Sequence, residues 1–191
     1  PYGTACRLQS RKVQPKGEDR THHNLALTIG FADRTNAGAM ARLQAKNSPR
    51  VVEIDYSFNE AVFEVELLEL EGGATIHSYS LHNVLAEKMR SLLQQPIRKR
   101  KRRQDVYDIW LLLASVEGLT AEEQAQIHQM LVDSCRSKGI EPTAASMDDK
   151  VVVEMAREGY AGLQDDVDGE LPDFDEAMAR VHALYRSLPW S

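Results

Sequence analysis

The sequence predicts an α+β protein in which a small β-sheet region, residues 1–79, is followed by a helical domain, residues 80–191. Two changes in pattern support this division. Hydrophobic residues alternate with a period of two in the first third of the chain, as in half-buried strands, and recur at helical spacing from Ser80 onward. The composition, 42% hydrophobic and 27% charged over 191 residues, is typical of a folded chain with one or two domains.

Three strands and one short helix are expected in the first region. Alternating apolar side chains predict strands over 25–31 and 52–58, and a shorter pattern predicts a third strand over 63–67. Between the first two strands, residues 38–46 favour a short helix that Asn47-Ser48-Pro49 would end.

Four helices are expected in the second region, because capping residues precede each apolar stripe or Pro or Gly follows it. Ser80 caps the first, Thr120 with Glu123 forms a capping box for the third, and Asp173 starts the last. The predicted spans are Ser80 to Pro96, Asp105 to Val116, Thr120 to Gly139 and Asp173 to Leu188.

Composition also limits the compartment and the chemistry. The longest apolar run, 109–114, has six residues, whereas a membrane helix needs about 20. Cys6 and Cys135 are too few and too far apart for a ligand cluster, so we expect free thiols and a cytoplasmic location. His22 and His23 would point to opposite faces of a strand, which makes them a poor metal pair.

Three charged residues lie where the helical pattern favours apolar ones. Lys88 falls inside the apolar stripe of the first helix, three residues after Leu85. Its side chain either snorkels to water or presents a fixed cation to a phosphate or carboxylate. Asp105 and Asp108 lie one turn apart on a helix that is otherwise almost entirely apolar. They either favour the helix dipole at its N-terminus or line a polar cavity.

Strand alternation places Glu53 and Asp55 on the same face, opposite Val52, Ile54 and Tyr56. Two explanations remain open for this carboxylate pair. The face is either simply solvated, or it contributes ligands to a divalent metal, since Mg²⁺ sites combine carboxylates with phosphate oxygens.

Six consecutive cations, Arg98, Lys99, Arg100, Lys101, Arg102 and Arg103, stand out in a chain of net charge −6. They fall in the connection between the first two predicted helices. Such a run would hold phosphates of a nucleotide or of RNA, and a solvated basic loop is the alternative. Aromatic residues do not interleave with it, so base stacking is not indicated.

Four segments together resemble one protein family. They are 51–60 (VVEIDYSFNE), 79–90 (YSLHNVLAEKMR), 104–110 (QDVYDIW) and 171–190, which begins LPDFDEA and ends SLPW. The chain is similar in these segments to the AbiEii/AbiGii-type nucleotidyltransferase toxins of toxin–antitoxin systems. The lysine helix followed by Asp-x-x-Asp is the most specific part of the resemblance.

The resemblance implies a partial nucleotidyltransferase-type mixed β-sheet with helices, truncated at its N-terminus, followed by a C-terminal helical bundle. It further implies transfer of a nucleoside monophosphate from a nucleoside triphosphate (NTP) to an RNA, such as a tRNA end, with Mg²⁺ as cofactor and a cognate antitoxin as partner. The implied catalytic residues are Asp55 as metal-binding carboxylate, Lys88 facing the phosphates, and Asp105 with Asp108 as a polar pair.

The implied binding residues complete this assignment. Arg102 and Arg103 would join Lys88 at the triphosphate, and Arg98, Lys99, Arg100 and Lys101 would bind nucleic acid. We also expect Asp55 to face a cleft that Lys88 and Asp108 line.

Two departures from the family pattern matter. The Gly-Ser signature and the Asp-x-Asp metal pair are absent from residues 1–24, and Gln104 stands where an arginine often precedes the aspartate. A truncated chain is the simpler explanation, and a degenerate member acting only as an RNA- or partner-binding module is the alternative. With a single expected metal carboxylate, we expect the 191-residue chain by itself to be inactive.

Overall fold

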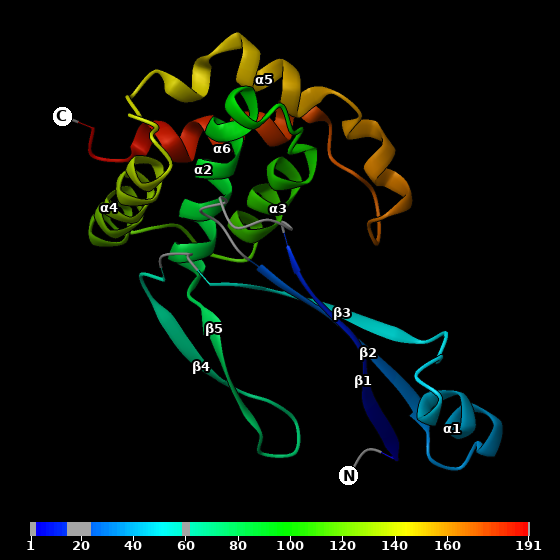
Figure 1. Cartoon of the computed structure of the whole chain (residues 1–191). Helices are drawn as coiled ribbons and strands as arrows, with labels where there is room; N and C mark the ends of the chain where they lie inside the picture. Colours follow the sequence, from blue (N-terminus) through cyan, green and yellow to red (C-terminus); the bar gives the residue numbers. More distant parts are fainter. Residues whose placement is uncertain (1–2, 15–23, 59–61, 191) are drawn as a thin grey trace. The chain divides into compact units, whose positions relative to one another are not determined.

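The computed structural model describes residues 3–14, 24–58 and 62–190, and shows an α+β protein with small antiparallel sheets and several helices (Figure 1). The predicted fold class is therefore confirmed. Two compact units are present, Pro1–Ala61 and Val62–Ser191. The sequence changes from strand to helix patterning near residue 79, whereas the second unit begins earlier and includes a β-hairpin. His22, His23, Asn59 and Glu60 lie outside the described residues.

The first unit is a three-stranded antiparallel sheet with strand order β1-β2-β3. Its strands are β1 (Thr4–Gln14), β2 (Asn24–Asp33) and β3 (Val51–Ser57), and α1 (Ala37–Gln44) connects β2 to β3. The side chain of Asn36 caps α1 by accepting a hydrogen bond from the backbone N–H of Ala39. The expected strands and helix of this region are present, and β1 is an additional strand that its many charged residues concealed.

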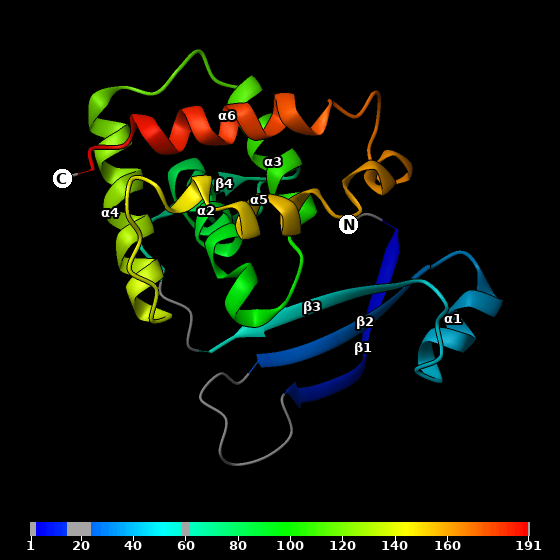
Figure 2. The same ribbon diagram turned by 90° about the horizontal axis from the view of Figure 1, so that it is seen from above.

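The second unit begins with the hairpin β4 (Val65–Glu69) and β5 (Thr75–Tyr79) and continues as a helical bundle. Its helices are α2 (Leu81–Arg98), α3 (Arg103–Ala114), α4 (Ala121–Ser137), α5 (Lys150–Arg157) and α6 (Phe174–Ser187). Seen from above, α2 lies among the other helices, and α3, α4 and α5 all contact it (Figure 2). No helix in the described part of the chain is long and apolar enough to span a membrane.

The core of the helical unit forms around α2. Leu85, Met89 and Leu92 are fully buried on one side of this helix, as the heptad-like spacing of its apolar stripe requires. They pack with Ile127 of α4 and Val181 of α6, among others, in one continuous hydrophobic cluster. Burial of each such side chain contributes about 1.5–3 kcal/mol, which makes α2 the main structural support of the unit.

Pro96 does not end the first helix of the bundle, contrary to the sequence prediction. Proline lacks the N–H that the carbonyl of Leu92 would otherwise receive. The side-chain amide of Gln95 donates to that carbonyl instead, at 3.1 Å. Because this substitute bond satisfies the backbone, α2 continues for two further residues to Arg98.

The predicted N-terminal caps of α2, α4 and α6 are confirmed. Ser80 accepts from the backbone of Asn83, and Asp173 accepts from the second and third residues of α6. At α4, Thr120 and Glu123 form a complete capping box. Helix α5 was not predicted, because its two turns lie in an acidic stretch of the sequence.

Removing the α4 cap should destabilise the helical unit without changing its fold. In Thr120→Ala the backbone N–H of Glu123 loses its side-chain acceptor, and the typical cost of such a loss is about 1 kcal/mol. Urea unfolding monitored by far-UV circular dichroism would measure the change, with Thr120→Ser as the control that keeps the hydroxyl. Equal stability of the alanine and serine variants would contradict the capping assignment.

Candidate functional site

Lys88 of α2 forms ion pairs with both aspartates of α3. Its Nζ lies 2.6 Å from Oδ2 of Asp108 and 3.3 Å from Oδ1 of Asp105. The three-residue spacing of the aspartates places both on one side of α3. The Lys88 side chain is only 23% exposed, so its ammonium is held between carboxylates and does not extend freely into water. We call Lys88, Asp105, Asp108 and the neighbouring Arg102 the lysine cluster.

Asp105 is the most buried member of the lysine cluster, at 9% exposure. Burial raises the pKa of its carboxyl group, and the nearby cations Lys88 and Arg102 only partly offset this effect. Its Oδ2 is buried without a hydrogen-bond partner and lies 3.9 Å from Nε of Arg102. Desolvation is therefore the main electrostatic influence on this carboxylate, although it is ion-paired.

Arg102 is positioned through its backbone. Its N–H donates to the side-chain oxygen of Gln95 at 2.7 Å, at the point where α3 begins. Burial lowers the pKa of Arg102 and Asp105 opposes the shift, but a guanidinium remains charged at any physiological pH.

The lysine cluster thus balances two cations against two carboxylates. A lysine ammonium has three N–H donors, and the aspartates accept from two of them. The remaining donor and the partly exposed Arg102 guanidinium are suited to an anionic group such as a phosphate.

Arg103 does not join the lysine cluster. Its guanidinium donates to the backbone carbonyl of Gly159, beyond the end of α5. We call the six consecutive cations from Arg98 to Arg103 the basic run. Within it, Lys101 forms an ion pair with Glu158. Arg98, Lys99 and Arg100 are exposed and form no ion pair with the described residues.

Asp55 lies in the first unit, on a polar face of the sheet. The strand register aligns Lys12, Ala26 and Asp55 in one row across the sheet. In the adjacent row, Glu53 pairs with Thr28. Both carboxylates line a cavity of about 230 Å³. The expected alternation of β3 is therefore present, with Glu53 and Asp55 on the same face.

The residues on this face do not complete a metal site. Carboxylates suit Mg²⁺, but the described parts of the chain contain no group of three or more His, Cys, Asp or Glu side chains that could hold a metal ion. Asp55 and Glu53 thus offer only part of a coordination set, and we derive no chemical step through a metal. Cys6 and Cys135 are free, as expected.

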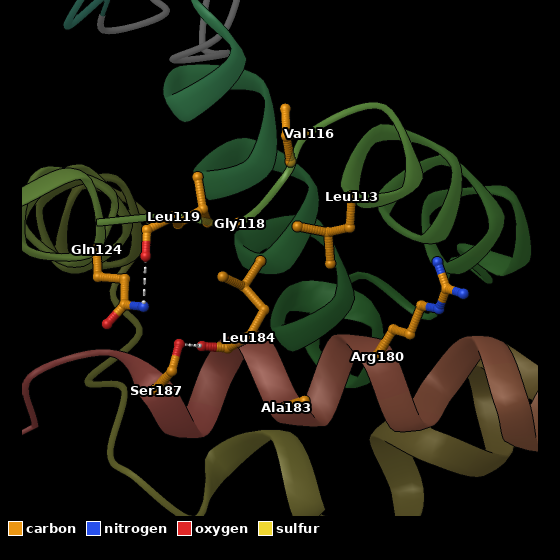
Figure 3. Close-up of a pocket in the computed structure, with 9 residues that line it drawn as sticks. All are labelled: Leu113, Val116, Gly118, Leu119, Gln124, Arg180, Ala183, Leu184 and Ser187. Carbon is orange, nitrogen blue, oxygen red and sulfur yellow. Dashed lines mark hydrogen bonds between the residues drawn. The ribbon is translucent and has the colours of Figure 1, made fainter. Parts of the chain in front are cut away.

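A separate cavity of about 280 Å³ lies between the end of α3 and α6 (Figure 3). Its floor is apolar, and Arg180 and Gln124 stand at its sides. The side-chain amide of Gln124 donates to the carbonyl of Leu119 within this cavity. None of the candidate residues discussed above lines it, so we assign it no part in the candidate site.

Gln95 is the main residue near the site that sequence analysis missed. It is 1% exposed and its side-chain amide makes three hydrogen bonds, to the backbone of Leu92, Val152 and Arg102. The available signal was a polar residue immediately before a proline near the end of an apolar helix. Sequence spacing alone gives no indication of its partners on α5 and in the basic run.

The carboxylates on the sheet of the first unit and the fixed cations on the helices of the second unit are, each by itself, of the kinds that suit the handling of phosphates. Comparison with family models identifies the family. The model described as nucleotidyl transferase AbiEii toxin, Type IV TA system, matches residues 7–180, and the chain belongs to this family. No curated protein and no solved structure matches the chain.

The raised pKa of Asp105 predicts a specific pH dependence of stability. The folded protein binds this proton more tightly than the unfolded chain does, so the resulting stability is present at acidic pH and is lost as the pH rises through the pKa of Asp105. The free energy of unfolding of wild type minus that of Asp105→Asn should therefore fall as the pH rises above about 4, the ordinary aspartate value.

Urea unfolding at a series of pH values would measure this difference. Asp166→Asn, at an exposed position without an ion pair among the described residues, controls for the loss of one negative charge. A difference that rises with pH would show that ion pairing, and not burial, dominates at Asp105.

Proposed function

We propose that the protein is a toxin that transfers a nucleoside monophosphate from an NTP to an RNA acceptor, such as a tRNA end, under the control of a cognate antitoxin in the cytoplasm. Family membership establishes the broader statement, a nucleotidyltransferase-type toxin of a toxin–antitoxin system. The observation that carries the finer proposal is the fixed ammonium of Lys88, which two aspartates hold at the surface of the helical unit.

In this proposal the lysine cluster binds the triphosphate. The acceptor hydroxyl attacks the α-phosphate, the bond to the β-phosphate oxygen breaks, and pyrophosphate leaves. Negative charge grows on the leaving oxygens, and cations that are already in place stabilise it without reorganisation. Lys88 and Arg102 supply such cations, Asp105 and Asp108 orient Lys88, and Arg103 holds the start of α3 by donating to the carbonyl of Gly159.

Asp55 is proposed as one carboxylate ligand of Mg²⁺, the metal that this type of chemistry generally uses to neutralise phosphate charge. Its support is its place on the polar face of the first sheet, beside Glu53. A solvent-accessible carboxylate of this kind is able to exchange water for a metal ion.

The basic run is the proposed RNA contact. Arg98, Lys99 and Arg100 present cations to solvent, and Lys101 adds a fourth when its exposed pair with Glu158 opens. Exposed ion pairs are worth about 0–1 kcal/mol, so phosphate is able to compete with Glu158. Contacts of this kind give affinity without sequence preference.

Transfer activity tests the proposal directly. The full-length gene product should be incubated with each labelled triphosphate, Mg²⁺ and total RNA, and labelled RNA should be quantified. We expect Lys88→Met and Asp55→Asn each to lower transfer by about a hundredfold or more, since loss of one charged stabilising group commonly costs this much.

Lys150→Met and Asp166→Asn are the matched controls, because both remove an exposed charge outside the proposed site. Labelled RNA at wild-type levels from the Lys88 variant would contradict the assigned site. RNA binding without any transfer by the full-length product would instead favour a non-catalytic binding module.

A further inference from the structure

The basic run is fixed to the rest of the helical unit at three points. Gln95 binds its C-terminal part at Arg102, Lys101 pairs with Glu158, and Arg103 donates to Gly159. The last two partners lie at the end of α5 and just beyond it. Without these contacts the four-residue connection 99–102, all of whose residues are cations, would repel itself and sample many conformations.

Of the three side chains that fix the basic run, Gln95, Lys101 and Arg103, only Gln95 is fully buried. Its side-chain amide makes three hydrogen bonds. Its Nε2 donates to the carbonyl of Leu92 at 3.1 Å and to that of Val152 at 3.2 Å, while its Oε1 accepts from the N–H of Arg102 at 2.7 Å. One amide group therefore connects α2, α5 and the start of α3. Apolar replacement would remove the hydrogen bonds that Gln95 makes to these backbone groups inside the protein, which is unfavourable.

The packing around Arg103 supports the same arrangement. A Cβ atom added at Gly159 would lie 3.0 Å from Nη1 of Arg103, and a Cβ atom added at Gly162 would lie 3.1 Å from the same nitrogen. The guanidinium thus fits against two glycines, and Gly159 also has a φ of +79°, which other residues rarely adopt. The two glycines after α5 therefore leave the space that the Arg103 side chain occupies.

We propose that Gln95 is a positioning residue for RNA binding: its buried amide holds the backbone of the basic run in place, so that the backbone carrying Arg98, Lys99 and Arg100 is ordered before phosphates bind. The RNA part of this inference rests on the proposed function. The physical basis is entropic, because a loop whose backbone is already ordered avoids the entropy cost of fixing that backbone when RNA binds.

A positioning role and a charge role have different salt signatures. In Gln95→Met the cations that contact phosphate are unchanged, so RNA affinity should fall about tenfold, the effect of ordering the backbone of about one residue on binding, while the slope of log K against log salt stays the same. In a variant with Arg98, Lys99 and Arg100 all changed to Gln, the slope itself should flatten, by about 0.7 per lost contact on single strands.

The experiment uses the full chain, fluorescently labelled total tRNA as the probe, and titrations at several salt concentrations. Leu131→Ala, a cavity variant in the buried part of α4, controls for general destabilisation and should bind RNA like wild type. Amide hydrogen exchange at Arg102 gives a readout that does not depend on RNA, and it should accelerate in Gln95→Met but not in Leu131→Ala.

The outcomes separate the two proposals. If wild type binds RNA and Gln95→Met binds it equally well with equal amide protection at Arg102, the inference is wrong and the proposed RNA acceptor stands. If Gln95→Met lowers affinity by flattening the salt slope, Gln95 does not act through positioning. If wild type binds no RNA at any salt concentration, both the RNA role of the basic run and the inference fail.

Discussion

The pairing of Lys88 with Asp105 and Asp108 is the constraint on which the candidate site depends. Ion pairs that are partly removed from water gain little net stability, since desolvation of the charges offsets much of their attraction. At Asp105 burial raises the pKa of the carboxyl group, and the nearby cations Lys88 and Arg102 only partly offset it, which is the direction that such a desolvation cost produces. In the proposed function this arrangement serves to fix an ammonium in place for an anionic phosphate.

Helix α2 positions Lys88 because different sides of the helix contact different neighbours. Its apolar stripe, including Leu85 and Met89, anchors the bundle core, while Lys88 emerges toward α3. A third side carries Glu87, which accepts from the hydroxyl of Ser134 on α4 and pairs with Arg90. These polar contacts fix the rotation of α2 against its neighbours, and the rotation determines where the Lys88 side chain points.

Much of this organisation was readable in the sequence. Capping residues such as Thr120 and Asp173 act locally, so their partners are fixed by spacing, and an inward lysine near an Asp-x-x-Asp helix signalled a shared polar site. The predicted helix end at Pro96 was wrong because a side chain replaces the hydrogen bond that proline cannot donate, and no local sequence pattern reveals this replacement.

The contacts of Gln95 with α5, and of Arg103 with Gly159, join segments more than fifty residues apart and depend on tertiary packing. Strand alternation gave the face on which Asp55 lies, but a face alone does not identify the other ligands of a metal.

The central claim is that the lysine cluster binds the phosphates of a nucleotide. Calorimetric titration of each nucleoside triphosphate into the full-length product, comparing wild type with Lys88→Met and Asp108→Asn, tests it most directly. We expect the affinity to fall at least about tenfold when the ammonium is removed, since hydrogen bonds to charged groups contribute about 1.5–3 kcal/mol. Asp108→Asn keeps a side-chain oxygen that is able to accept from Lys88 and so to orient it, but removes a negative charge that competes for the ammonium, so the affinity should be equal or higher. Wild-type affinity in Lys88→Met would show that the lysine cluster does not bind the nucleotide.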